Sequence, residues 1–164
     1  MYKKYIKRFI DIVFSLFLLV ALSPILLICY IAVKLNSPGP AIFKQTRLCK
    51  NGKSFIMYKF RSMYVNSEHT GTGVYSFKGD KRVTKVGNIL RKTSLDELPQ
   101  LVNILKGEMS FIGPRPALWN QDDLVAERDK YGANDVRPGL TGWAQINGRD
   151  ELEIPVKAKL DGEY

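Results

Sequence analysis

Apolar residues concentrate near the start of the chain, where Ile12–Val33 form an uncharged run of 22 residues. At about 1.5 Å per residue, a helix over this run is long enough to cross a hydrocarbon core of about 30 Å. Ser23-Pro24 stands at its middle, and a proline removes a backbone donor and clashes with the carbonyl four residues earlier. The pattern therefore predicts a helix broken at Ser23 and Pro24, where the serine hydroxyl can bond a freed carbonyl.

Three topologies compete for this run. A cleaved signal peptide is disfavoured because the run is too long and Pro24 directly follows its small-residue site. A spanning helix is expected to have a basic flank on one side only. Here both flanks are basic, with Lys3, Lys4, Lys7 and Arg8 before the run and Lys34, Lys44, Arg47, Lys50 and Lys53 after it. By the positive-inside rule both flanks favour the cytoplasm, so a re-entrant hairpin that enters one leaflet and returns is preferred.

The more polar remainder predicts a mixture of strands and helices. Asn36-Ser37-Pro38-Gly39-Pro40 is expected to end the apolar segment. Two strand-like runs, Ala41–Leu48 and Ser54–Arg61, flank Asn51-Gly52, which predicts a β-hairpin with a turn that Cys49 and Lys50 could lengthen. Residues 65–80 are rich in Gly, Ser and Thr and predict a loop.

Four further segments have helical spacing of apolar residues. Residues 83–92 predict a basic amphipathic helix suited to a membrane surface. Residues 94–105 predict a helix in which Ser94 and Glu97 match the S-x-x-E capping box. Residues 118–131 and 153–164 predict two more helices. The expected fold is α+β and mostly helical, with a re-entrant membrane helix-break-helix over 1–36 and a cytoplasmic domain over 37–164 that holds the hairpin and interfacial amphipathic helices.

Charge and composition narrow the classes of partner. The formal net charge of +9 favours nucleic acid, anionic lipid headgroups or phosphorylated substrates. There is no helix-turn-helix or RNP-like signature, so nucleic acid is not expected. The two cysteines, Cys29 and Cys49, fit neither a zinc site nor a disulfide framework. With His69 the only histidine, chemistry that needs two histidines is excluded.

Asp96-Glu97 has a functional interpretation, although the sequence alone favours a structural one. Two adjacent carboxylates can hold Mg²⁺, and a carboxylate can attack phosphorus to form an aspartyl-phosphate. A carboxylate at a helix start is also expected to stay ionised. The structural alternative is that both acids only cap a helix, as a capping box requires.

Three other segments have a functional and a structural interpretation. Arg115, fixed between two prolines, offers a rigid fork for phosphate oxygens or forms part of a surface turn. Lys59 and Arg61 would share one face of a strand, and that face is either a binding surface or simply solvated. The glycine-rich stretch 137–150 permits close approach to a ligand, or forms a core turn around a buried Trp143.

Taken together, these segments resemble the bacterial sugar transferase family, the monotopic phosphoglycosyl transferases. The similarity spans nearly the whole chain, and the order of many short motifs is more specific than any one of them. The matching motifs are Lys7-Arg8 with Asp11, Ser23-Pro24, Gly39-Pro40, Lys59–Met63, Asp80 with Arg82, Leu90-Arg91, Ser94–Leu101, Gly113–Pro116 and Arg137–Arg149.

The resemblance implies an enzyme that moves sugar-1-phosphate from a UDP-sugar to polyprenol (undecaprenyl) phosphate and releases UMP. It implies that Asp96 is the nucleophile, that Glu97 is its partner, and that both hold Mg²⁺. It places basic side chains near the phosphates, namely Lys59, Arg91, Arg115 and Arg149. It also implies a broken re-entrant helix in membrane lipid, at the cytoplasmic face of the bacterial inner membrane. The reaction would be the first membrane step of glycoconjugate or exopolysaccharide synthesis.

Two departures from the family pattern, one rival mechanism and one rival function stay open. The family usually has glycine at Cys49, and its pattern continues beyond Tyr164, so the chain is expected to be truncated. A single-step reaction without covalent enzyme is the mechanistic alternative. A membrane-tethered protein that binds anionic lipid or nucleic acid would also explain the positive charge. The sugar, the pathway and the oligomeric state are not fixed by the sequence.

Overall fold

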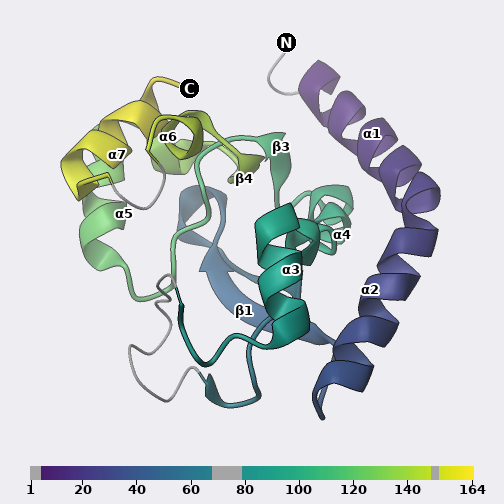
Figure 1. Cartoon of the computed structure of the whole chain (residues 1–164). Helices are drawn as coiled ribbons and strands as arrows, with labels where there is room; N and C mark the ends of the chain where they lie inside the picture. Colours follow the sequence, from purple (N-terminus) through teal and green to yellow (C-terminus); the bar gives the residue numbers. More distant parts are fainter. Residues whose placement is uncertain (1–4, 68–78, 149–151) are drawn as a thin grey trace. The chain divides into compact units, whose positions relative to one another are not determined.

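The computed structural model describes residues 5–67, 79–148 and 152–164. Over these residues the fold is α+β: about half of it is helical, and the described strands form two small two-stranded sheets (Figure 1). The chain divides into two compact units. The first unit comprises Met1–Phe17, Gln45–Met57 and Gln100–Tyr164, and the second comprises Leu18–Lys44 and Tyr58–Pro99. The expected boundary between a membrane part (1–36) and a cytoplasmic part (37–164) stays a prediction.

The apolar run is broken where the sequence predicts. Helix α1 (Lys7–Ala21) and helix α2 (Ser23–Asn36) meet at an angle of 63° (Figure 1). Pro24 lacks the N–H that would donate to the carbonyl of Val20, and the Ser23 hydroxyl donates to that carbonyl instead, at 2.8 Å. Neither helix alone has the length and apolar composition of a membrane span, whereas the bent pair together does. The predicted break at Ser23 and Pro24 is therefore confirmed.

Helix α1 buries polar side chains and exposes apolar ones. Its buried residues are Asp11 and Ser15, whereas Phe9 and Phe17 are more than 60% exposed. Asp11 accepts a hydrogen bond from the backbone N–H of Phe111 at 3.2 Å, within the first unit. In water this arrangement would leave a large apolar surface unburied, and such surfaces mark contact with a membrane or a protein. In membrane proteins, ionisable residues of apolar helices usually face the protein interior in this way.

The second unit is built on the packing of α2 against α3 (Lys85–Thr93). Cys29 and Val33 from α2 join Leu90 from α3 in a buried cluster with Ala41 and Phe60. Helix α3 begins where the Thr84 hydroxyl accepts a hydrogen bond from the N–H of Gly87 at 2.9 Å. The predicted basic helix over 83–92 is confirmed, and one apolar side of it is buried against α2.

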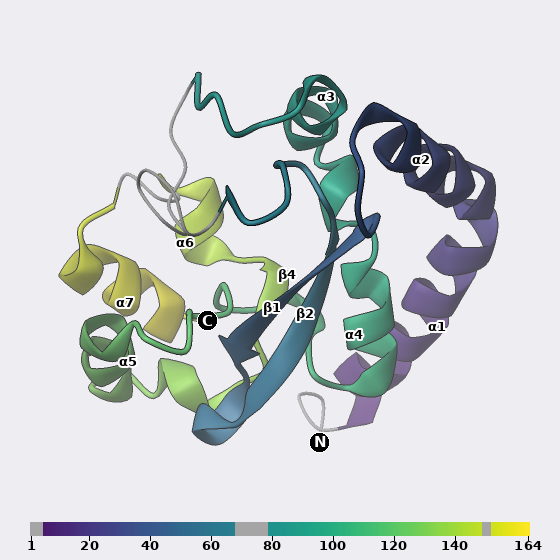
Figure 2. The same cartoon turned by 90° about the horizontal axis from the view of Figure 1, so that it is seen from below.

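The predicted hairpin is present as strands β1 (Ile42–Leu48) and β2 (Ser54–Phe60), which lie side by side in Figure 2. The connection contains a 3₁₀ turn, η2 (Lys50–Gly52), in which Asn51 has a φ of 59°. Asparagine tolerates this left-handed conformation better than most residues, which suits it to the turn.

The predicted helix over 94–105 is wrong in its first half. The segment forms a 3₁₀ turn, η4 (Leu95–Glu97), followed by helix α4 (Gln100–Lys106). Pro99 has no N–H to donate to the carbonyl of Leu95, which accepts from Leu98 instead in the 3₁₀ pattern. Ser94 has a left-handed φ of 57°, and its side chain makes no cap hydrogen bond. The capping-box interpretation of Ser94 and Glu97 is therefore also wrong.

The rest of the first unit contains a parallel strand pair that the sequence does not predict. Strand β3 (Ser110–Ile112) pairs with β4 (Gly139–Thr141), so that Ser110 lies opposite Gly139. The backbones approach so closely that a Cβ at Gly139 would lie 2.1 Å from the nitrogen of Gly113. Glycine is required there for this close packing.

Four short helical elements complete the first unit. Helices α5 (Asp122–Asp129) and α7 (Ile154–Gly162) occupy the centres of the helices expected over 118–131 and 153–164 and pack side by side (Figure 2). The 3₁₀ turn η5 (Ala133–Asp135) and helix α6 (Trp143–Ile146) lie between them in sequence. Trp143 is 47% exposed and donates to Glu163, so the expectation of a buried tryptophan is wrong.

Candidate active site

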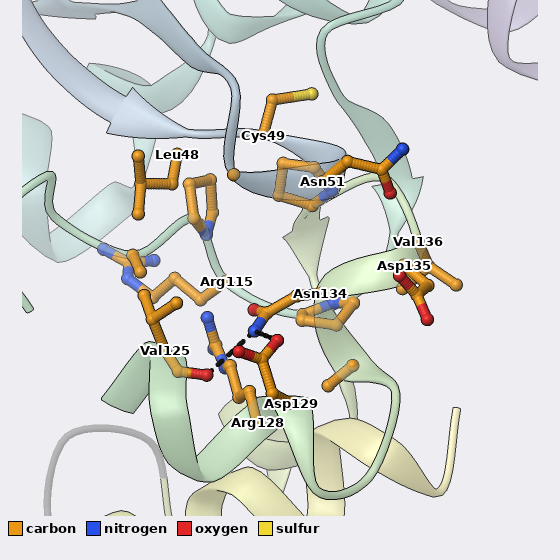
Figure 3. Close-up of a pocket in the computed structure, with 16 residues that line it drawn as sticks. Leu48, Cys49, Asn51, Arg115, Val125, Arg128, Asp129, Asn134, Asp135 and Val136 are labelled. Atoms are coloured by element: carbon orange, nitrogen blue, oxygen red, sulfur yellow. Dashed lines mark hydrogen bonds between the residues drawn. The ribbon is translucent and has the colours of Figure 1, made fainter. Parts of the chain in front are cut away.

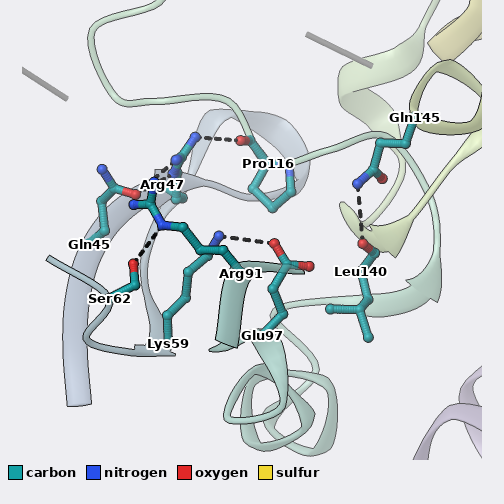
Figure 4. A network of polar contacts seen from close by, with 9 residues as sticks. All are labelled: Gln45, Arg47, Lys59, Ser62, Arg91, Glu97, Pro116, Leu140 and Gln145. Atoms are coloured by element: carbon teal, nitrogen blue, oxygen red, sulfur yellow. Dashed lines mark hydrogen bonds and ion pairs between the residues drawn. The ribbon is translucent and has the colours of Figure 1, made fainter. Parts of the chain in front are cut away.

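The carboxylate pair lies in the 3₁₀ turn η4, immediately after α3. Asp96 is buried, with 9% of its surface exposed. Glu97 accepts an ion-paired hydrogen bond from Lys59 near the end of β2, with 3.1 Å between Nζ and Oε1 (Figure 4). Both side chains of this pair are at least 85% buried, so it is not a loose surface ion pair. The hairpin and the turn after α3 thus bring Lys59 and the carboxylate pair together.

Burial and charge act in opposite directions on Asp96. Burial raises the pKa of its carboxyl above the usual value, and the nearby negative charge of Glu97 raises it further. The positive charges of Lys59 and Arg91 lower it. Burial is the larger effect, so the pKa of Asp96 lies above its usual value, and Lys59 and Arg91 counteract only part of that rise. The expectation that helix geometry keeps this carboxylate ionised is therefore not confirmed.

Arg91 lies in the last turn of α3, and its guanidinium is held in place. Its Nε donates to the hydroxyl of Ser62 at 2.8 Å (Figure 4). Burial lowers the pKa of Arg91, and the negative charges of Asp96 and Asp80 raise it. Since arginine stays protonated in proteins, this guanidinium is a fixed positive charge near Asp96.

Four of the predicted site residues therefore lie together in the second unit, namely Lys59, Arg91, Asp96 and Glu97. Arg115 belongs to the first unit, where it lines a pocket of about 360 Å³ with Arg128 and Asp129 (Figure 3). Arg149 lies outside the described residues. Arg115 and Arg149 as phosphate-binding residues stay predictions.

Arg61 has a structural role that the strand pattern does not predict. It follows the end of β2 and is only 5% exposed. Its two terminal nitrogens donate to the carbonyls of Ser37 and Pro38, at 2.8 and 2.7 Å, just after α2 ends. The interpretation of Lys59 and Arg61 as neighbours on one solvated strand face is therefore wrong. Arg61 anchors the chain that leaves α2 instead.

The donor set can be compared with the requirements of Mg²⁺. Among the described residues, no three His, Cys, Asp or Glu side chains are grouped so that they could hold a metal by themselves. Mg²⁺ commonly binds one or two carboxylates and completes its shell with substrate phosphates and water. Asp96 and Glu97, adjacent in sequence and close enough for the charge of Glu97 to act on Asp96, fit that kind of site.

A family model for bacterial sugar transferases matches residues 2–164. The chain belongs to this family. Three relatives are similar over most of it. UDP-glucose:undecaprenyl-phosphate glucose-1-phosphate transferase of Escherichia coli (strain K12) is 45% identical over 97% of this chain and 36% of its own length. The uncharacterized sugar transferase EpsL of Bacillus subtilis (strain 168) is 42% identical over 97% of this chain and 77% of its own length.

The third relative is the UDP-N-acetylgalactosamine-undecaprenyl-phosphate N-acetylgalactosaminephosphotransferase of Aeromonas hydrophila. It is 44% identical over 87% of this chain and 34% of its own length. The chain thus spans about a third of the length of the Escherichia coli and Aeromonas hydrophila relatives, and about three quarters of the length of the Bacillus subtilis relative.

Ser62 is the site residue that the sequence interpretation leaves without a role. It lies between two residues that the sequence does single out, in the segment Lys59–Met63 that contributes to the family resemblance. No local pattern indicates its contact, because Arg91 is 29 residues away in sequence. Only the packing of α3 against the segment after β2 brings the two together.

Proposed function

We propose that this chain transfers sugar-1-phosphate from a UDP-sugar to polyprenol phosphate. The grouping of a buried Asp96 with Glu97, Lys59 and Arg91 is the observation that carries the proposal. Membership of the bacterial sugar transferase family supports it, as do the activities in the names of the Escherichia coli and Aeromonas hydrophila relatives. Those two relatives use different sugars, so the identity of the sugar is left open.

In the first step, an oxygen of ionised Asp96 attacks the β-phosphorus of the UDP-sugar. The bond from that phosphorus to the oxygen bridging the two phosphates breaks, and UMP leaves with the bridging oxygen. The positive charges of Lys59 and Arg91 favour the ionised form of Asp96 against the effect of burial, and they would stabilise negative charge on the phosphoryl oxygens. Preset positive charge of this kind supplies most of the catalysis in phosphoryl transfer.

In the second step, a phosphate oxygen of the polyprenol phosphate attacks the same phosphorus. The bond to Asp96 breaks, the carboxylate is restored, and the sugar-bearing polyprenol diphosphate leaves. Lys59 holds Glu97 beside Asp96 throughout, so the pair keeps its geometry between the steps. Asp96 and Glu97 would hold Mg²⁺, which supplies Lewis-acid stabilisation of phosphoryl charge when it is bound.

The bent helix pair is the part of the chain that we expect to place this reaction at the membrane. We propose that α1 and α2 enter the cytoplasmic leaflet and return. The outward apolar side chains support this topology, as do the basic flanks and the Ser23-Pro24 break. A re-entrant hairpin would hold a catalytic site at the interface, where a soluble nucleotide-sugar and a lipid phosphate can both reach it.

A turnover assay in membranes tests the proposal. The protein is supplied with polyprenol phosphate and a panel of UDP-sugars, and UMP release is measured. We expect release with at least one sugar, loss of release in Asp96→Asn, and normal release in a control at the exposed Asp122, Asp122→Asn. Absence of UMP with every sugar, together with salt-sensitive binding to anionic vesicles, would support the binding-protein alternative instead.

A further inference from the structure

Ser62 contacts both ends of helix α3, through Thr84 at its start and Arg91 in its last turn. We propose that Ser62 is a positioning residue of the transfer reaction, whose hydroxyl sets the orientation of the Arg91 guanidinium near Asp96. This inference rests on the proposed function. It adds a residue that acts on the reaction through Arg91 and does not itself touch the substrate.

The side chains of Ser62 and Arg91 are in direct contact. The Ser62 hydroxyl accepts from Nε of Arg91 at 2.8 Å, and Ser62 is only 9% exposed. A hydrogen bond at Nε restricts rotation about the last bond of the aliphatic chain and so fixes the plane of the guanidinium. The plane of the guanidinium determines which oxygens its N–H groups can bind, so a hydrogen bond at Nε fixes the orientation of those donors.

Ser62 is itself fixed against the start of α3. Its carbonyl accepts from the backbone N–H of Thr84 at 3.0 Å, and Thr84 caps the helix. A Cβ at Gly87 would lie 1.9 Å from that same carbonyl oxygen, so only glycine permits the approach. The hydroxyl that holds Arg91 in the last turn is therefore attached to backbone locked at the first turn.

The Ser62 hydroxyl can be removed without removing the contacts that hold α3. The contact of Ser62 with the start of α3 uses its backbone, and Leu90 of α3 packs in the cluster with α2, so both remain when the Ser62 hydroxyl is removed. The change expected from Ser62→Ala is therefore the loss of the hydrogen bond at Nε of Arg91, with α3 still in place. Misplacement of a charge-stabilising group by about 1 Å lowers rates by up to about 100-fold. Positive charge at such a site stabilises mainly the negative charge that develops in the transition state.

A double-mutant cycle tests the role in catalysis. We expect Ser62→Ala to lower kcat by about 10–100-fold with little change in KM, and Ser62→Thr to retain most of the activity. Ser54→Ala, at an exposed serine that begins β2, serves as the control. Arg91→Lys lacks Nε, so Ser62→Ala should have no further effect in that background. An equal loss in both backgrounds would overturn the proposal.

A second measurement reads the contact without any turnover. In ¹⁵N-labelled protein in detergent, the Nε proton of Arg91 should exchange slowly in the wild type and rapidly in Ser62→Ala. Equal exchange in the two proteins would overturn the positioning contact. Wild-type protein that is inactive on every UDP-sugar would contradict the proposed function, and the exchange measurement would still decide whether Ser62 holds Arg91.

Discussion

Replacing Pro24 by alanine tests the physical origin of the bend between α1 and α2. The structure has one unmet backbone bond at the break, because Pro24 has no N–H for the carbonyl of Val20, and the Ser23 hydroxyl occupies that carbonyl. An alanine at this position restores the donor and removes the clash of the proline ring with the preceding turn. The substitution should therefore favour one continuous helix.

The size of the effect follows from the lengths of the helices. Proline inside a helix costs about 3 kcal/mol relative to alanine, which shifts the balance toward a straight helix by about 100-fold. A helix continuous over Lys7–Asn36 would be about 45 Å long, longer than a hydrocarbon core of about 30 Å. A straight helix can therefore span the bilayer, and it would place the two basic flanks on opposite faces.

Protease protection of tags at the two ends of the chain, in inside-out vesicles, distinguishes the topologies. In the wild type both tags should be on the cytoplasmic face, and in Pro24→Ala a large fraction of molecules should have them on opposite faces and lose activity. Pro155→Ala, which removes a proline from the start of α7, is the matched control. Wild-type tags on opposite faces would contradict the re-entrant topology. Tags of Pro24→Ala that are protected as in the wild type would contradict Pro24 as the origin of the bend.

Two further predictions concern charged pairs. Lys59→Met removes a positive charge that lowers the pKa of Asp96. Because ionised Asp96 is the attacking form, the acidic limb of the kcat/KM profile should move to higher pH in this variant. An acidic limb at the wild-type position would refute this prediction. Arg128 forms an ion pair with Asp161 at 2.5 Å, and both side chains are at most 3% exposed. Arg128→Met should therefore destabilise the folded protein by about 3 kcal/mol and lower the thermal midpoint by about 6–12 °C. Burial raises the pKa of Asp161, so the carboxyl left alone in Arg128→Met should take up a proton at acidic pH, and the loss of stability should be smaller there. Adding Asp161→Asn to this variant should recover part of the lost stability.

The features predicted correctly from the sequence are those decided by local chemistry. The break at Ser23-Pro24 follows from one missing donor, and the hairpin follows from two alternating runs around Asn51-Gly52. The capping box failed although its motif was present. Pro99 ends the first turn after Leu95, and the left-handed backbone of Ser94 connects α3 directly to η4, so no helix begins at Ser94.

The features missed depend on residues far apart in sequence. Strands β3 and β4 have three residues each, and their pairing brings Ser110 to Gly139 through close contact of glycine-containing backbone. Such short parallel strands have no periodicity that would indicate them. Asp96 and Glu97 were candidates from their own chemistry, and the family resemblance gave each its role, whereas the Lys59–Glu97 ion pair and the rise in the pKa of Asp96 result from tertiary packing.

The central claim is that Asp96 makes a bond to phosphorus. Protein given a UDP-sugar that supports turnover, without polyprenol phosphate, is analysed by intact mass and peptide mapping. We expect an added mass of one sugar phosphate on the peptide that contains Asp96, its loss when polyprenol phosphate is added, and no adduct in Asp96→Asn. An adduct that persists in Asp96→Asn, or single-turnover transfer to polyprenol phosphate with no adduct at any time, would contradict it.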